Sequence, residues 1–570
     1  MAKASAKAKP AKTTKKTSAL RMANAKAAEK AAKRLRSATL DPGWAVAPFA
    51  VSAPPAPERK GAPIEIEDLY DFQLVGDPNI SPDGGQVAVS VTHIDKQSNE
   101  YRAAIWRFPL DGEAPVRLTS GRWADGSPRW SPDGEWIAFT SKRETKAPQI
   151  WLLPTGGGEA RQITDLDNGA SDIEWAPDSR RIVFTSQVSP EKPDPENDVR
   201  VITSARYKFD GQGFLDDKMR QLWTVDALAE TPEPAQLTSG PFNHGSPRWS
   251  PTGREIAFIA NRDPEREMSS ISDLWTIPAT GGEPRRLTDG KGSFGSPAWS
   301  PDGTRIAIAG DREVQPRVQN ARLFVIAAGG GEPAPVGTAF DRAIGDRSIS
   351  GPTGNGDGPT IRWTPDGSRI DALVSDRGST VVVRFDPVGD GATQLTGRDR
   401  HVAAFDHIDG GDGLVISVAD PTTPFELRRI TSDGETALST INEAWTATRA
   451  VATPEEFWID SGGETIQGWL LRPAGNSADG PAVPLILNVH GGPHAQFSPA
   501  FFHELQLYAS RGFALVYINP RGSLGYREEF AQMVTGAWGE ADAPDFLAAI
   551  EHVIGLGGID PERIGVSGGS

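Results

Sequence analysis

Gly565-Val566-Ser567-Gly568-Gly569-Ser570 ends the 570-residue sequence and decides how the fold is interpreted. Arg563 and Ile564 lead into this stretch after a turn at Asp560-Pro561, which predicts a short buried strand that runs into a glycine-rich bend. A serine held at a sharp strand-to-helix turn needs neighbours without side-chain bulk, because the backbone there is tight and strained. The stretch therefore predicts an exposed serine hydroxyl at the end of a buried strand.

The preceding 120 residues predict the sheet to which this strand belongs. Residues 483–489 are an almost continuous apolar run, which is typical of a central strand covered on both faces, and residues 513–518 form a second such run. Helices are expected over 499–511 and 543–554, and a hairpin over 457–471. The strand–helix–strand–helix–strand order indicates a parallel α/β sheet, the fold class of the α/β-hydrolases. His552 lies on the second expected helix and is predicted to face solvent.

The first apolar run ends in a glycine-rich loop, His490-Gly491-Gly492-Pro493. An oxyanion site needs backbone N–H groups that point at the developing negative charge, and bulk there would block the substrate. A lone Gly-Gly-Pro sequence is equally well explained as a tight loop. Its place about 75 residues before a strand that runs into Gly-Gly-Ser makes the catalytic interpretation more specific.

The middle of the chain repeats one turn motif six times. In this motif a proline is followed by aspartate or threonine and, in most copies, by glycine. Five of the copies come after a tryptophan. Apolar residues at every second position follow the motif. The copies are Ser81-Pro82-Asp83-Gly84, Trp130-Ser131-Pro132-Asp133-Gly134, Trp175-Ala176-Pro177-Asp178, Trp249-Ser250-Pro251-Thr252-Gly253, Trp299-Ser300-Pro301-Asp302-Gly303 and Trp363-Thr364-Pro365-Asp366-Gly367. Proline presets the backbone of such a turn and glycine relieves its last position.

The spacing of the motif predicts a β-propeller. Successive motif prolines are 50, 45, 74, 50 and 64 residues apart, and a four-stranded blade needs about 40–50 residues. With a degenerate unit at 405–430, the repeats give seven blades. Radial packing is expected because a single blade cannot bury both of its faces. A β-sandwich does not explain the fixed phase of the motif. The longest gap holds the insertion 206–214, whose arginine and aromatic residues predict either a solvated hairpin or a ligand contact.

Four motifs in order resemble the prolyl oligopeptidase family, in particular its acylaminoacyl-peptidase and dipeptidyl-peptidase-like branch. They are His490-Gly491-Gly492-Pro493-His494, Asn519-Pro520-Arg521-Gly522-Ser523-Leu524-Gly525-Tyr526, Trp538-Gly539 and the stretch 560–570. The resemblance implies a seven-bladed β-propeller plus an α/β-hydrolase with a doubly wound, mostly parallel sheet that is incomplete at its carboxyl end. It also implies a serine peptidase that acts on short peptides, with the propeller limiting substrate size. The repeats alone resemble TolB-type propellers equally well.

Two serines compete for the role of nucleophile. A literal Gly-x-Ser-x-Gly match selects Ser567, whereas the family pattern Gly-Gly-Ser selects Ser570, which we prefer. The resemblance implies that Gly492, and less certainly Gly491, donates one oxyanion N–H. The imidazole of His490 is expected to be structural or to contact substrate.

The partners of the nucleophile do not follow it in this sequence. The hydrolase order is serine, then acid, then histidine, and nothing follows Ser570. Without a base the hydroxyl stays a weak nucleophile, so we expect this chain as it stands to be inactive. We also expect it to be a truncated form of a longer peptidase, with uncovered strand edges that favour aggregation.

Composition limits the remaining possibilities. Residues 1–40 hold twelve Lys or Arg and one acid, a charge of +11, so that the total of −16 leaves −27 for the rest. We expect residues 1–40 to be a disordered basic tail and 41–64 a linker, followed by the propeller at 65–445 and the hydrolase portion at 446–570. Two alternatives for the tail are an arm that binds nucleic acid weakly and a targeting segment. The acidic charge of the rest of the chain argues against nucleic acid as a partner. The sequence has no cysteine and no long apolar run, which predicts a cytoplasmic protein without a membrane span.

Peptides are therefore the expected partners, without a cofactor or a metal ion. Two other functions stay open at this point. One is a non-catalytic TolB-like propeller that binds peptides or proteins, and the other is an esterase or other acyl hydrolase on the same scaffold.

Overall fold

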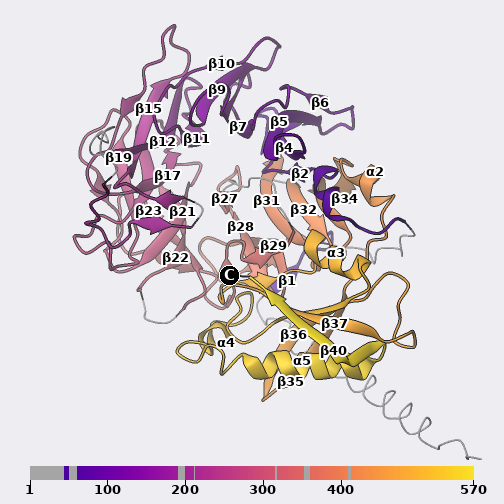
Figure 1. Cartoon of the computed structure of the whole chain (residues 1–570). Coiled ribbons are helices and arrows are strands. Elements are labelled where there is room, and N and C mark those ends of the chain that lie inside the picture. Colours follow the sequence, from indigo (N-terminus) through magenta and orange to yellow (C-terminus); the bar gives the residue numbers. More distant parts are fainter. Residues whose placement is uncertain are drawn as a thin grey trace, which may run out of the picture.

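The structure, a computed structural model, describes residues 44–50, 61–189, 199–210, 212–314, 318–351, 360–408 and 413–569. The predicted basic tail, residues 1–40, lies outside the described residues, and so does Ser570. The described part has a propeller of radially arranged sheets beside a smaller α/β unit (Figure 1). None of the described helices is both long enough and apolar enough to cross a membrane.

Within the described residues the propeller has seven four-stranded units, which we call blades one to seven. The innermost strands are β3 (Asn79–Ile80), β7 (Gly126–Trp130), β11 (Ser171–Trp175), β17 (His244–Trp249), β21 (Ser293–Trp299), β27 (Ile361–Trp363) and β31 (His401–Ile408). The second strands are β4 (Gln86–Asp95), β8 (Trp136–Ser141), β12 (Arg181–Val188), β18 (Glu255–Ala260), β22 (Arg305–Asp311), β28 (Ile370–Asp376) and β32 (Gly413–Asp420).

Two outer strands complete each blade. The third strands are β5 (Glu100–Pro109), β9 (Gln149–Pro154), β15 (Met219–Asp226), β19 (Asp273–Pro278), β23 (Arg322–Ala327), β29 (Ser379–Phe385) and β33 (Thr423–Thr431). The fourth strands are β6 (Val116–Arg117), β10 (Arg161–Gln162), β16 (Ala235–Gln236), β20 (Arg285–Arg286), β24 (Ala334–Val336), β30 (Ala392–Gln394) and β34 (Gly434–Ala437). Blades six and seven share one sheet because Thr380 pairs with His401. Short strands β2 (Leu74–Val75) and β25 (Ala343–Ile344) add to blades one and six.

The core of the propeller lies between the blades. One apolar cluster joins Ile150 and Leu152 of blade two to Phe184 of blade three, and another joins Val183 of blade three to Phe258 of blade four. These side chains are fully buried. Each blade therefore buries its two faces against its neighbours, which is the reason why the repeats close into a ring.

The repeated tryptophan has a role that the turn motif alone did not reveal. The indole N–H of Trp175 donates to the backbone oxygen of Arg129 at 3.0 Å, and that of Trp363 donates to Ala298 at 3.0 Å. Trp249 and Trp299 donate in the same way to Glu174 and Arg248 of the preceding blade. The tryptophan thus hydrogen-bonds each of these blades to the one before it.

This arrangement predicts a difference between two equivalent substitutions. Trp175→Phe is expected to lower the free energy of unfolding by about 1 kcal/mol more than Trp130→Phe, because the indole N–H of Trp130 has no hydrogen-bond partner among the described residues. Urea denaturation of the two variants measures the difference. Equal losses would show that the inter-blade hydrogen bond contributes nothing.

The α/β unit contains a five-stranded sheet in the order β35-β36-β39-β37-β40. Its strands are β35 (Glu455–Ser461), β36 (Glu464–Leu471), β37 (Val483–Val489), β39 (Ala514–Asn519) and β40 (Ile559–Gly568). β39, β37 and β40 are parallel as predicted, but β35, β36 and β39 are antiparallel neighbours. The described sheet is therefore mixed rather than mostly parallel, because the short turn at Gly462-Gly463 forces β35 and β36 into a hairpin.

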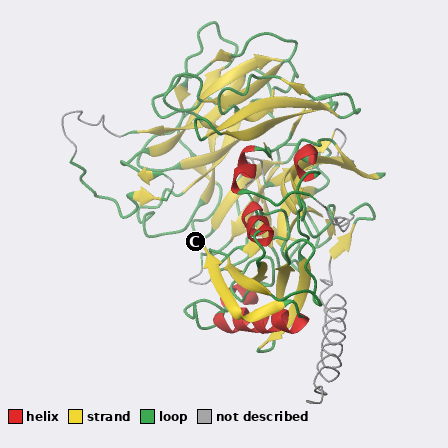
Figure 2. Ribbon diagram, turned by 45° about the vertical axis from the view of Figure 1, so that its right-hand side comes forward, coloured by secondary structure: helices red, strands yellow, loops and turns green. Residues whose placement is uncertain are grey.

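Helices cover both faces of this sheet (Figure 2). α5 (Ala543–Leu556) packs on the face that carries Val516 and Ile518, and α3 (His503–Ser510) packs on the face that carries Leu515 and Tyr517. The alternation along β39 places successive side chains on opposite faces. α4 (Glu528–Gln532) was not predicted. His552 of α5 does not face solvent as expected; it is half-buried, and its ring packs on Phe457 with centroids 4.9 Å apart.

The predicted linker, residues 41–64, is partly structured. Trp44–Val46 forms β1, which pairs in parallel with β30 of blade six. Ala62 bridges to Arg449, and the N–H of Ile64 donates to the Ser510 hydroxyl of α3 at 3.0 Å. The short helix η1 (Ile66–Tyr70) precedes the propeller blades in the sequence, and the short helix α2 (Glu443–Thr446) follows them. The insertion predicted at 206–214 is a small hairpin of β13 (Lys208–Phe209) and β14 (Gly213–Phe214).

Candidate active site

The predicted nucleophile strand, β40, lies beside the strand that leads into the glycine loop, but it is largely exposed and not buried as expected. β40 pairs in parallel with β37, with Ser567 opposite Asn488 and Gly568 opposite Val489. The two strands therefore end at the same level, and His490 follows one as Gly569 follows the other. The carboxyl end of β40 points toward the propeller (Figures 1 and 2). Ser567 is a regular strand residue; Ser570 lies outside the described residues, so its placement stays a prediction.

The glycine loop leaves Gly492 accessible. Gly492 is exposed and has a φ of 125°, a conformation that residues with a side chain rarely adopt. A Cβ added there would lie 2.8 Å from the backbone nitrogen of His494. Gly491 is half-buried, and its carbonyl oxygen faces the ring of His490. The preference for Gly492 over Gly491 as an N–H donor stays a prediction.

His490 holds the loop instead of acting as a base. Its Nδ1 lies 2.8 Å from the Gly491 carbonyl oxygen, which requires Nδ1 to carry the proton, and its Nε2 lies 3.0 Å from the Ser523 hydroxyl, which then donates. Burial lowers the pKa of His490, so the ring is neutral near pH 7. The ring also packs edge-on against Phe497.

The second motif, Asn519 to Tyr526, supports the glycine loop from behind. The side chain of Asn519 accepts from the N–H of Phe497 at 2.6 Å and donates to its carbonyl oxygen at 3.1 Å. Tyr526 donates its hydroxyl to Gln467 at 2.5 Å. Arg521 makes two hydrogen bonds to Asp545 of α5, at 3.1 and 2.6 Å, and Asp545 is fully buried. A buried bidentate pair of this kind fixes the loop firmly to the helix.

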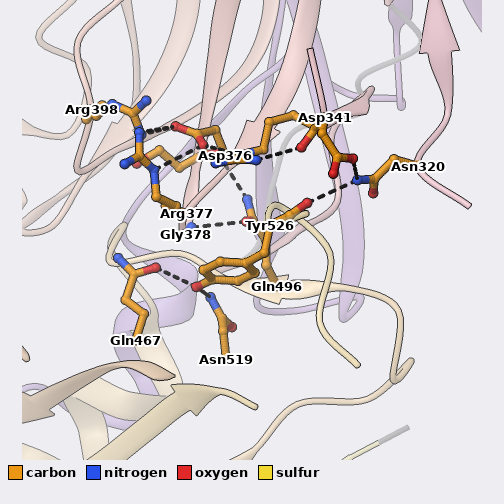
Figure 3. Close-up of polar contacts among 12 residues, drawn as sticks. Asn320, Asp341, Asp376, Arg377, Gly378, Arg398, Gln467, Gln496, Asn519 and Tyr526 are labelled. Atoms are coloured by element: carbon orange, nitrogen blue, oxygen red, sulfur yellow. Dashed lines mark hydrogen bonds and ion pairs between the residues drawn. The ribbon is translucent and has the colours of Figure 1, made fainter. Parts of the chain in front are cut away.

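The propeller directly contacts the segment that follows the glycine loop and the loop of the second motif (Figure 3). Strand β26 (Ser348–Ile349) of the propeller pairs in parallel with β38 (Gln496–Phe497), which follows the glycine loop. The fully buried side chain of Gln496 accepts from the N–H of Gly378 and donates to the Ser379 carbonyl oxygen, both at 3.0 Å. The glycine loop is therefore held between the sheet of the hydrolase and blade six.

These supporting residues were not selected from the sequence. Gln496 and Asp545 carry no motif signal of their own, and their partners lie 118 and 24 residues away. Asn519 and Arg521 lie inside one of the four motifs, but no residue pattern indicated what their side chains would contact. Among the described residues no group of three or more His, Asp or Glu side chains could hold a metal ion.

A cavity of about 570 Å³ lies elsewhere and is lined by the innermost strands of the propeller. Its wall includes the residues that precede the repeated tryptophans, among them Arg129, Glu174, Arg248 and Arg362, and also His407. β31 runs from His401, beside the hydrolase contacts, to His407 at the cavity, a distance of roughly 20 Å for an extended strand. The cavity is therefore separate from the predicted catalytic site.

Glu174 in this cavity gives a pH-dependent prediction. Burial raises the pKa of Glu174 to about 7, against the attraction of Arg248. A carboxyl group with a raised pKa stabilises the fold at pH values below its unfolded-state pKa, and that contribution is lost as the pH rises through 7. Glu174→Gln is therefore expected to gain stability relative to the natural chain between pH 5 and pH 8, as measured by urea midpoints. A constant difference over this range would contradict the assignment.

Comparisons with known proteins agree with this geometry. Residues 499–570 match the model of the prolyl oligopeptidase family, and residues 69–207 match that of the TolB β-propeller domain. The uncharacterized peptidase YuxL of Bacillus subtilis is 33% identical over 518 residues, which cover 89% of this chain and 78% of YuxL. This chain belongs to the prolyl oligopeptidase family.

Other members of the family are similar over the same length. Dipeptidyl-peptidase 5 of Porphyromonas gingivalis is 24% identical over 91% of this chain and 77% of its own. An acylaminoacyl peptidase solved in complex with Z-Gly-Gly-Phe-chloromethyl ketone matches with a TM-score of 0.75 at 24% identity, over 89% of this chain and 75% of that one. This likeness confirms the fold: a propeller joined to part of an α/β-hydrolase. The chain is thus a homologue of the serine peptidases of this family.

Proposed function

We propose that the protein is a serine peptidase of short peptides that works through an acyl-enzyme on Ser570. The Ser570 oxygen attacks the peptide carbonyl carbon, the amine leaves with a proton, and water then releases the acid and regenerates the hydroxyl. The observation that carries the proposal is the register of β40 on β37, which ends the nucleophile strand beside the glycine loop. Gly492 is an exposed residue, and its N–H is the proposed donor to the oxyanion.

The proposal includes a role for the propeller. Its blades five, six and seven contact the hydrolase through residues such as Asn320, Gly378 and Asp420. We infer that substrates reach Ser570 only past these contacts, so that folded proteins are excluded and short or unfolded peptides are accepted. The complex of the related acylaminoacyl peptidase with a peptide-derived chloromethyl ketone supports peptides as the substrate class.

An acid and a histidine base are needed for this chemistry, and the hydrolase order places both after the nucleophile. The 570-residue sequence holds neither after Ser570.

A labelling comparison tests the proposal. A neutral fluorophosphonate is incubated with the 570-residue chain and with the product of the complete reading frame of its gene, and peptide and ester substrates are compared on both. Labelling of the reading-frame product together with peptide hydrolysis is the expected result. Absence of labelling in both proteins would favour a peptide-binding propeller, and ester hydrolysis without peptide hydrolysis would favour another acyl hydrolase.

A further inference from the structure

The cavity of the propeller is lined by the same strand position in six blades. This position is the second-last residue of the innermost strand, which in five of these blades directly precedes the repeated tryptophan. We call the six side chains the channel ring; they are Asn79, Arg129, Glu174, Arg248, Ala298 and Arg362, in the order of the blades. The cavity volume of about 570 Å³ lies within the range of roughly 300–1,000 Å³ that small-molecule sites have.

Two of the three ring arginines have acidic partners. Arg129 pairs with Asp77 at 2.7 Å, and Arg362 pairs through Nη1 with Asp406 at 3.2 Å. The Nε of Arg362 donates to the Phe405 carbonyl oxygen at 3.3 Å, and the whole side chain is 24% exposed. Each of these two pairs is neutral as a unit, and that of Arg362 remains accessible from the cavity.

The third ring arginine, Arg248, forms no ion pair with any residue that the structure describes. Its guanidinium donates to the carbonyl oxygen of Pro247 at 2.7 Å. Glu174, one blade earlier, supplies the carboxyl group of the ring, and it accepts the backbone N–H of Trp249 at 2.9 Å. Burial raises the pKa of Glu174 to about 7 in spite of the attraction of Arg248. Near neutral pH, Glu174 therefore balances the charge of Arg248 only in part.

The ring leaves room between two of its arginines. Ala298 of blade five lies between Arg248 of blade four and Arg362 of blade six, and it contributes only a methyl group to the wall. Burial lowers the pKa of Arg362, and the positive charges of Arg129 and Arg248 lower it further. The guanidinium groups of Arg248 and Arg362 are thus close enough to repel each other. An anion between them would relieve that repulsion.

We propose that the channel cavity is a second binding site, where Arg248 and Arg362 hold the terminal carboxylate of a short peptide. A guanidinium group matches a carboxylate with two parallel hydrogen bonds. A ligand group with a single negative charge fits, because only Arg248 lacks an acidic ion-pair partner. Trp299 and Pro301 also line the cavity and offer apolar surface to the rest of the peptide. The site involves no residue of the proposed catalytic machinery, so it stands or falls independently of that proposal.

Calorimetric titration of the 570-residue chain at pH 6 tests the proposal. The probes are acetyl-Ala-Ala with a free carboxyl terminus, the same peptide as its amide, and inorganic sulfate. The acid is expected to bind about tenfold or more tightly than the amide, the size of a charge-assisted hydrogen bond. Equal affinity for acid and amide, no detectable binding of the acid, or tighter binding of sulfate than of the acid would overturn the proposal.

Substitutions assign the binding to the ring. Arg248→Gln is expected to abolish most of the preference for the acid while changing the thermal midpoint little, because no ion pair is lost. Arg362→Lys keeps a positive charge beside Asp406 but loses the planar fork, so the preference should fall several-fold. Arg254→Gln, an exposed arginine in the turn after β17 of the same blade, is the control. A preference that survives in Arg248→Gln, or is lost equally in Arg254→Gln, would contradict the assignment.

The pH dependence of binding gives a readout that a folding defect cannot imitate. Ionisation of Glu174 places a negative charge beside Arg248, so the affinity for the acid should fall several-fold from pH 6 to pH 8. Glu174→Gln should retain tight binding at pH 8. The cavity also holds Asp172 and His407, and a histidine is the other side chain that commonly changes charge in this range. A fall of the same size in Glu174→Gln would contradict the placement of the ligand beside Glu174 and Arg248.

Discussion

Gly492→Ala is expected to lower the rate of fluorophosphonate labelling of the reading-frame product by about 100-fold or more. Alanine rarely adopts a φ of 125°, and its Cβ would lie 2.8 Å from the His494 nitrogen, so the loop has to move. If Gly492 donates to the oxyanion, that movement removes the hydrogen bond, and loss of one such donor costs about 10²–10³ in rate. The rate constant for labelling, measured at several probe concentrations, checks the prediction.

A glycine in the same kind of conformation supplies the control. Gly463, in the turn between β35 and β36, has a φ of 87° and open space around its Cα. Gly463→Ala is expected to reduce stability through backbone strain but to leave the labelling rate unchanged. If both variants label at the natural rate, Gly492 is not the oxyanion donor; if both lose rate equally, the effect is one of folding.

Asp376→Asn is expected to reduce the free energy of unfolding by about 3–5 kcal/mol. Asp376 is fully buried and forms ion pairs with three arginines, so a neutral amide leaves their positive charges close together without the carboxylate that attracts them. Removal of one partner from a buried charge network is strongly destabilising for this reason. Urea denaturation of the 570-residue chain measures the loss.

The exposed Asp433, in the turn before β34, provides the matched substitution. Asp433→Asn removes the same charge and should change the free energy of unfolding by less than about 0.5 kcal/mol. A loss of similar size in the two variants would mean that total charge, not the ion pairs of Asp376, sets the effect. A small loss in Asp376→Asn would show that these ion pairs contribute little to the free energy of unfolding.

Local sequence signals predicted the architecture well because they repeat. Six copies of one turn motif, five of them after a tryptophan, predicted the strands of the propeller, and the apolar runs at 483–489 and 513–518 became β37 and β39. The degenerate seventh unit was also placed correctly, as β31 to β34. The helix expected over 499–511 is shorter, His503–Ser510, because the backbone of Phe501 hydrogen-bonds to Asp420 and Gly351 instead.

The contacts that hold the candidate site together could not be predicted in the same way. Gln496, Asp376 and Asp545 act across distances in the sequence that no local pattern encodes. Their partners are known only once the propeller and the sheet are placed side by side. The strand at Trp44–Val46 was missed for a related reason: three residues paired to a distant edge carry no periodicity.

The central claim is that the hydroxyl of Ser570, and not that of Ser567, is the nucleophile at the end of β40. Tandem mass spectrometry of the fluorophosphonate-labelled reading-frame product locates the modified serine directly. We predict a single modification on Ser570, with none on Ser567 and none in Ser570→Ala. Modification of Ser567, or labelling that persists in Ser570→Ala, would contradict the account.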